Sequence, residues 1–150
     1  MCGTDSSKGA NAAVEHAIRL GRALHVPVVL AYTMDTGADA DPATPHEVAE
    51  AERVLKARVQ QRVEQARANL SARAAAAGGD GIETIVLDGT PGDALIAHGA
   101  KIDAAWIVVG AHGTSKAHAV RDAALGWLLG STAERVVRHS GRPVIVVPPI

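Results

Sequence analysis

Apolar residues recur along this chain with the periods of alternating strands and helices. Over residues 10–24 they fall three or four positions apart, which predicts a helix. The compact apolar run at residues 28–32 predicts a strand, and the Gly-, Asp- and Pro-containing residues 35–45 predict an exposed loop. A second apolar stripe, from Val48 to Leu70, predicts a long helix that ends near Gly78.

The second half of the chain repeats this alternation. Thr90 followed by Pro91 is typical of a helix start, with threonine as the N-cap residue. Ser131 and Glu134 have the spacing of a capping box, in which Ser131 would be the N-cap of the last helix. The pattern as a whole predicts strands at residues 82–87, 106–109 and 144–147, and helices at residues 90–102 and 131–139.

Strands that alternate with helices predict an α/β fold. We expect residues 1–150 to form a single domain, with a mostly parallel five-stranded sheet and helices on both faces. Ligands of such sheets bind beyond the carboxyl ends of the strands. Asp5, Thr33, Gly89 and Gly110 all follow predicted strand ends, so a pocket is expected where they meet.

Composition narrows the possible partners. Hydrophobic residues make up 47% of the chain, but only Tyr32, Trp106 and Trp127 are aromatic, so Val, Ile, Leu and Ala must build the core. A net charge of -1 provides no excess of positive charge that would attract nucleic acid or an anionic membrane.

The single cysteine, Cys2, excludes an internal disulfide and, as an ordinary thiol, fits a cytoplasmic location. No stretch has the pattern of a membrane span or a secretion signal.

Two glycine-containing segments carry the candidate chemistry. The first, Gly110-Ala111-His112-Gly113, follows the strand predicted at residues 106–109, and the second, Gly130-Ser131, opens a helix. Glycine lets a phosphate approach the backbone closely, and a helix N-terminus offers unpaired N–H donors to an anion. Together the segments predict a phosphate-binding site.

Over nearly its whole length the chain resembles the universal stress protein family. The matching pieces are Gly3-Thr4-Asp5-Ser6-Ser7, the long middle helix, residues 87–91 and the block from Ile107 onward. That block contains the glycine segments and the ending Arg142-Pro143-Val144-Ile145-Val146-Val147. Nucleotide-binding members of that family carry Gly-x2-Gly-x9-Gly-(Ser/Thr). The resemblance implies a stress-response module that binds ATP or another adenine nucleotide, with or without Mg²⁺. It also implies a homodimer that pairs through Val144–Val147.

The resemblance also assigns roles to the site residues. Asp5 would meet the adenosine end, Thr33 would present backbone groups to adenine, and Gly89 would line the pocket wall. The full set of expected nucleotide-binding residues is Asp5, Thr33, Gly89, Gly110, His112, Gly113, Gly130, Ser131 and Thr132.

Two features depart from the family pattern. Sixteen residues separate Gly113 from Gly130 where the motif has nine, and the extra seven lie within residues 114–129. They would form a flap or short helix at the pocket mouth, or else they would displace Gly113. The first strand also looks truncated, because only Met1 and Cys2 precede the Gly3-Thr4-Asp5 turn. Either natural N-terminal residues are missing or this region is rearranged.

Simpler explanations exist for several of these residues. Gly110 and Gly113 could serve only to permit the turn from the strand into the loop. Ser131 has a structural use as an N-cap, and Asp5 could cap the first helix or stabilise its turn. His112 and His118 are most simply solvated loop histidines, and no cluster has metal-site spacing. No catalytic residues can be assigned, because the sequence indicates no Ser-His-Asp or Cys-His set and lacks the Walker A lysine pattern. Enzyme activity is therefore at most slow ATP hydrolysis, and a family member that binds no nucleotide and acts through protein contacts is the alternative.

Overall fold

The core of the molecule is a five-stranded parallel sheet. The computed structural model describes residues 1–5, 7–34, 45–79, 81–112 and 129–148. The strand order is β3-β2-β1-β4-β5, and every ladder is parallel. The strands are β1 (Cys2–Thr4), β2 (Val28–Met34), β3 (Ile82–Asp88), β4 (Ile107–Gly110) and β5 (Val144–Val147). The predicted fold class is confirmed.

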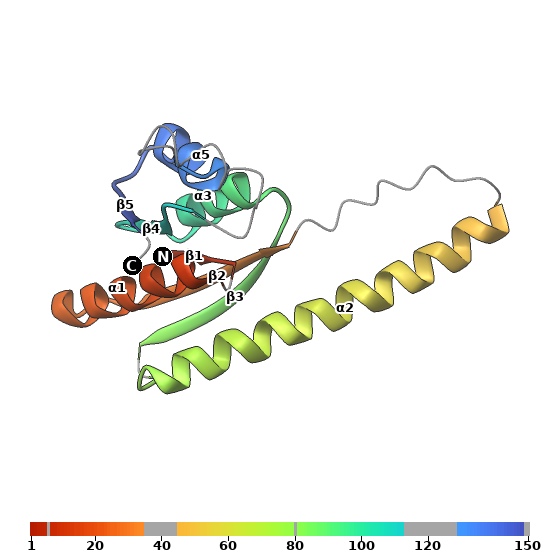
Figure 1. Ribbon diagram of the computed structural model, residues 1–150, viewed down its shortest axis with the longest axis horizontal. Helices are drawn as coiled ribbons and strands as arrows, with labels where there is room; N and C mark the ends of the chain where they lie inside the picture. The colour runs from red at the N-terminus through yellow and green to blue at the C-terminus, as the bar shows by residue number, and fades with distance from the viewer. Residues whose placement is uncertain (6, 35–44, 80, 113–128, 149–150) are drawn as a thin grey trace.

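Helices cover both faces of the sheet (Figure 1). Helices α1 (Lys8–Leu24) and α2 (Pro45–Ala76) pack on one face, in a cluster that contains Ala13, Leu30 and Leu70. Helices α3 (Pro91–Lys101) and α5 (Ser131–His139) pack on the other face, around Leu95 and Val136. Among the described residues, no helix combines the length and apolar character needed to cross a membrane.

The first strand is short, as predicted, yet it holds the central place in the sheet. Its three residues pair with Leu30, Ala31 and Tyr32 of β2, whereas its ladder with β4 has the single pair Cys2–Val108. Met1 extends this contact, since its amino group donates to the carbonyl of Trp106 (2.9 Å) and its carbonyl accepts from the N–H of Val108 (2.8 Å). Gly3 and Thr4 belong to this strand and not to the turn where the sequence pattern had placed them.

Helix starts follow the local chemistry only in part. Ser7 caps α1 by accepting a hydrogen bond from the N–H of Ala10 (3.1 Å), so the helix begins two residues before the predicted start. Thr90 is the N-cap of α3, as predicted, although its side chain makes no capping hydrogen bond. The predicted capping box of α5 is wrong, because Gly130 is the N-cap and Ser131 is the first helical residue. Glu134 instead pairs with Arg138 (3.0 Å).

The long helix α2 buries less than its apolar stripe predicted. Its buried side chains among the described residues are those of Ala66, Leu70 and Ala74, whereas Val59 and Val63 are only half-buried. At about 1.5 Å per residue the 32-residue helix is about 48 Å long, while the seven-residue β2 spans about 23 Å. The N-terminal half of α2 therefore extends past the sheet (Figure 1). The loop predicted at residues 35–45 falls outside the described residues except for Pro45.

Cys2 is expected to resist alkylation in the folded protein. Its side chain is fully buried, and this burial raises the pKa of the thiol to about 12, although the charges of the N-terminus and Arg73 act in the opposite direction. At pH 8 the thiolate fraction is then on the order of 10⁻⁴, and the thiolate is the reactive form. We expect iodoacetamide to label Cys2 only after denaturation, as measured by intact mass. Rapid labelling of the native protein would show that β1 opens.

Candidate functional site

Four of the predicted site residues lie at the carboxyl edge of the sheet. Asp5 directly follows β1, Thr33 is the penultimate residue of β2, Gly89 directly follows β3, and Gly110 ends β4. Parallel strands all point the same way, so these positions share one edge (Figure 1). This edge is the candidate functional site.

A backbone hydrogen bond joins the two glycine segments. The N–H of Gly130 donates to the carbonyl of Ala111 (2.8 Å), and the N–H of Ala111 donates to the carbonyl of Val147 at the end of β5 (2.8 Å). The start of α5 is therefore held against the end of β4, even though 18 residues separate Ala111 from Gly130. Gly113 and the expected flap over residues 114–128 lie outside the described residues.

The N-terminus of α5 presents backbone donors beside this junction. Gly130, as N-cap, has no side chain to accept from the first turn, and no side-chain capping bond is made. The first N–H groups of a helix have no partner within it, so those of Ser131 and Thr132 point out of the helix end. The side chain of Ser131 is exposed and that of Thr132 is half-buried. This arrangement suits an anion.

Asp5 stabilises the turn between β1 and α1. Its Oδ1 atom accepts a hydrogen bond from the N–H of Ser7 (2.9 Å), and Ser7 in turn caps α1. Of the two structural roles that the sequence left open, the turn role is therefore observed, while the cap belongs to Ser7. The carboxylate of Asp5 is half-buried and lies at the end of the central strand.

Thr33 and Gly89 shape the neighbouring part of the edge. The ladder between β1 and β2 ends at the pair Thr4–Tyr32, so Thr33 and Met34 extend beyond it. Gly89 donates from its N–H to the carbonyl of Met34 (2.9 Å) and has a φ of 105°, a conformation that favours glycine. The backbone of Thr33 is thus next to a turn that only glycine adopts without strain.

His112 directly follows Ala111, whose carbonyl accepts the hydrogen bond from Gly130. Its Nε2 atom is buried and the residue as a whole is half-buried, so His112 is less exposed to water than the sequence pattern predicts. The sequence pattern does not indicate this partial burial. In the described part of the chain, no group of His, Cys, Asp or Glu is arranged to hold a metal ion.

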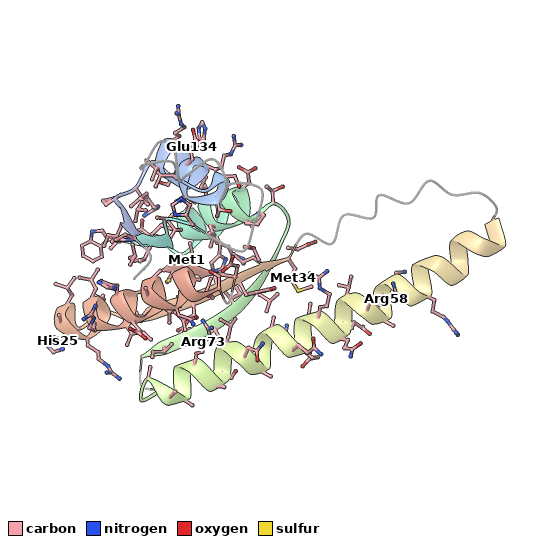
Figure 2. All side chains as sticks on the ribbon, viewed as in Figure 1. Met1, His25, Met34, Arg58, Arg73 and Glu134 are labelled. Atoms are coloured by element: carbon pink, nitrogen blue, oxygen red, sulfur yellow. The ribbon has the colours of Figure 1, made fainter. Side chains whose placement is uncertain are left out.

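Arg73 is a residue near the site that the sequence did not reveal. It comes from α2 and donates from Nη1 to the Oγ1 atom of Thr4 (3.4 Å), next to Asp5 (Figure 2 labels Arg73 on the side of α2 that faces the sheet). Its position three residues after the buried Leu70 was the available signal, because that spacing returns to the same helix face. In the sequence, Arg73 cannot be distinguished from the exposed arginines of α2.

Comparisons with known proteins agree with the fold. The family model described as the universal stress protein family matches residues 1–148. No protein with a curated description matches the chain.

Solved structures of universal stress proteins have a similar fold. Hypothetical protein MJ0577 is 22% identical, with 97% of this chain and 92% of that chain covered and a TM-score of 0.73. The universal stress protein UspA from Lactobacillus plantarum is 25% identical, with 97% and 93% covered and a TM-score of 0.70. A universal stress protein in complex with cAMP is 26% identical, with 97% and 92% covered and a TM-score of 0.59.

Proposed function

The chain belongs to the universal stress protein family, and from that premise we propose that it is a cytoplasmic stress-response regulatory module that binds an adenine nucleotide. The nucleotide binds at the carboxyl edge of the sheet, and ATP, with or without Mg²⁺, is the form we propose. The observation that carries this proposal is the hydrogen bond from Gly130 to Ala111, which holds the two glycine segments together beside the uncapped end of α5. A relative that is 26% identical was solved with cAMP, which supports an adenine nucleotide as the ligand class.

Each part of the nucleotide has a proposed partner. The phosphates meet the N–H groups of Ser131 and Thr132 and the backbone of Gly110, Gly113 and Gly130, with His112 beside them. The adenosine end meets Asp5 and the backbone of Thr33, which extends beyond the β1–β2 ladder. Gly89 lines the wall next to Thr33.

This set of groups favours binding over catalysis. Backbone N–H donors stabilise phosphate charge but do not orient an attacking water, which phosphoryl transfer requires. The Walker A lysine is absent from the sequence. We therefore propose that ATP hydrolysis, if measured, is slow, and that the bound nucleotide acts as a regulatory signal.

Wild-type protein is expected to bind ATP. Native mass spectrometry of the freshly purified protein should show a retained adenine nucleotide, and titration with fluorescently labelled ATP and Mg²⁺ should saturate. Unlabelled ATP should displace the probe, whereas GTP at equal concentration should not, since the adenine contacts are backbone groups at Thr33 with fixed donor and acceptor positions. If no binding were measured at millimolar ATP, the alternative would be favoured, in which this protein binds no nucleotide and acts through protein contacts alone.

We propose further that the protein is a homodimer that pairs through β5. The N–H groups of Ile107 and Ala111 donate to the carbonyls of Pro143 and Val147, so alternation along β5 turns the backbone groups of Val144 and Val146 toward the free edge. An apolar edge strand of this kind is a pairing site unless it is covered.

Val146→Pro is expected to give monomers. Proline removes the outward N–H of Val146 and is tolerated on an edge whose N–H faces away from the sheet. Light scattering at micromolar protein should give the mass of two chains for the wild type and for the control Val146→Ile, which keeps the N–H. The mass of one chain for the wild type would contradict the dimer.

A further inference from the structure

The charge of this protein is unevenly distributed along α2. Residues 53–63, here called the basic arm, contain four basic residues and no acidic one. The whole chain has a net charge of -1, so the remaining residues carry -5. The acidic residues of α2 lie outside the arm, either before Arg53 or at Glu64, which pairs with Arg67 (3.7 Å). The whole-chain charge therefore conceals a local charge of +4.

The basic arm lies on the part of α2 that extends past the sheet. The buried residues of α2 among those described are Ala66, Leu70 and Ala74, all of which follow the arm in sequence. Lys56, Arg58 and Arg62 are exposed, and Figure 2 shows Arg58 on the segment of α2 that lies away from the sheet. At about 1.5 Å per residue, the 11 residues of the arm form a helical rod about 16 Å long.

The basic side chains point to opposite sides of this rod. At about 100° per residue, Arg58 is rotated by about 200° from Lys56, whereas Arg62 is only about 40° from Arg58. A flat anionic membrane would need positive charge next to one broad face of large apolar residues. The arm contains no aromatic residue and only one leucine, Leu55, beside its alanine and valine residues. The arrangement therefore fits a partner with negative charge on two sides.

A groove of duplex DNA has this property. A helix is about 10–12 Å across with its side chains, and the major groove of B-form DNA is about 12 Å wide with phosphates along both walls. We propose that the basic arm binds duplex DNA through its phosphates, without sequence specificity, with Lys56, Arg58 and Arg62 as the contact residues. This proposal rests on α2 alone and is independent of the nucleotide site.

The test is the binding of the full chain to a fluorescein-labelled 24-base-pair duplex of random sequence. Three phosphate contacts predict that the logarithm of the association constant falls with the logarithm of salt concentration with a slope of about -2.7 between 50 and 200 mM KCl. The variant R58Q/R62Q should reduce this slope to about -0.9 and weaken binding at 50 mM KCl by about tenfold or more. The control R19Q/K101Q changes the net charge equally at exposed positions of α1 and α3 and should match the wild type.

Three results would overturn the proposal. The first is no binding by the wild type at 50 mM KCl and 100 µM protein, a concentration at about the weak limit of non-specific DNA binding. The second is an equal loss in the R19Q/K101Q control, which would indicate diffuse attraction. The third is flotation with phosphatidylglycerol vesicles that depends on Arg58 and Arg62 without any binding of the duplex. Circular dichroism of both variants checks that the fold is unchanged.

Discussion

Leu30→Ala is expected to lower the free energy of unfolding by about 2–5 kcal/mol. Leu30 is fully buried in the middle of β2, where it pairs with Cys2 of the short central strand and packs against α1 and α2. Alanine removes apolar contacts and leaves a cavity at the place where both helices meet the sheet. Whole domains are stable by only about 5–15 kcal/mol, so this single change would remove a large share. Urea denaturation followed by circular dichroism measures it.

The matched control is Leu24→Ala, the same chemical change at the end of α1. The side chain of Leu24 is 44% exposed, so its truncation is expected to change the free energy of unfolding by about 0.5 kcal/mol or less. If both variants lost equal stability, the α1–α2 face of the sheet would not be the core that the structure describes.

The order of strands and helices was predictable because each element buries one face. The apolar positions of α1 recur at helical spacing, and Ala13, Ala17 and Ile18 are all buried against the sheet. The strands near the middle of the sheet are covered on both faces, so the apolar run that predicts β4 is continuous. These patterns follow from which residues are buried, and the packing of the buried faces determines the arrangement of the elements.

Helix boundaries were less predictable because tertiary contacts decide them. Ser131 and Glu134 have capping-box spacing, yet α5 is capped one residue earlier. The N–H of Gly130 is bonded to Ala111, a residue 19 positions before it, and this contact fixes where the helix begins. The apolar stripe of α2 likewise continues beyond the sheet that could cover it. The sequence of α2 does not indicate how long β2 is, so the extent of burial along α2 could not be predicted.

The candidate site was predictable in its strand-end residues and not in its side-chain partners. The glycines and Asp5 follow strand ends, so the topology of a parallel sheet is enough to bring them to one edge. Arg73 reaches Thr4 from a helix 69 residues away in sequence, and only the packing of α2 reveals it. The partial burial of His112 is likewise visible only in the folded chain.

Ser131→Pro is expected to weaken ATP binding by roughly 10- to 100-fold while the fold stays intact. Hydrogen bonds to charged groups contribute about 1.5–3 kcal/mol, and proline removes one such N–H donor from the proposed phosphate contact. Proline is well suited to the first position of a helix, as Pro91 of α3 illustrates. The extended conformation of Gly130, with φ of -60° and ψ of 153°, is also one that a residue before proline adopts. Titration with labelled ATP measures the loss.

The control Ser131→Ala separates the backbone from the side chain. It removes the hydroxyl but keeps the N–H, so its affinity for ATP should stay much closer to that of the wild type than the affinity of Ser131→Pro does. Circular dichroism and urea denaturation should show both variants folded, because the cap of α5 is Gly130 and not Ser131. If Ser131→Pro bound ATP as tightly as the wild type, the phosphates would not lie at the N-terminus of α5. A nucleotide retained by that variant would then have to be held elsewhere along the carboxyl edge of the sheet.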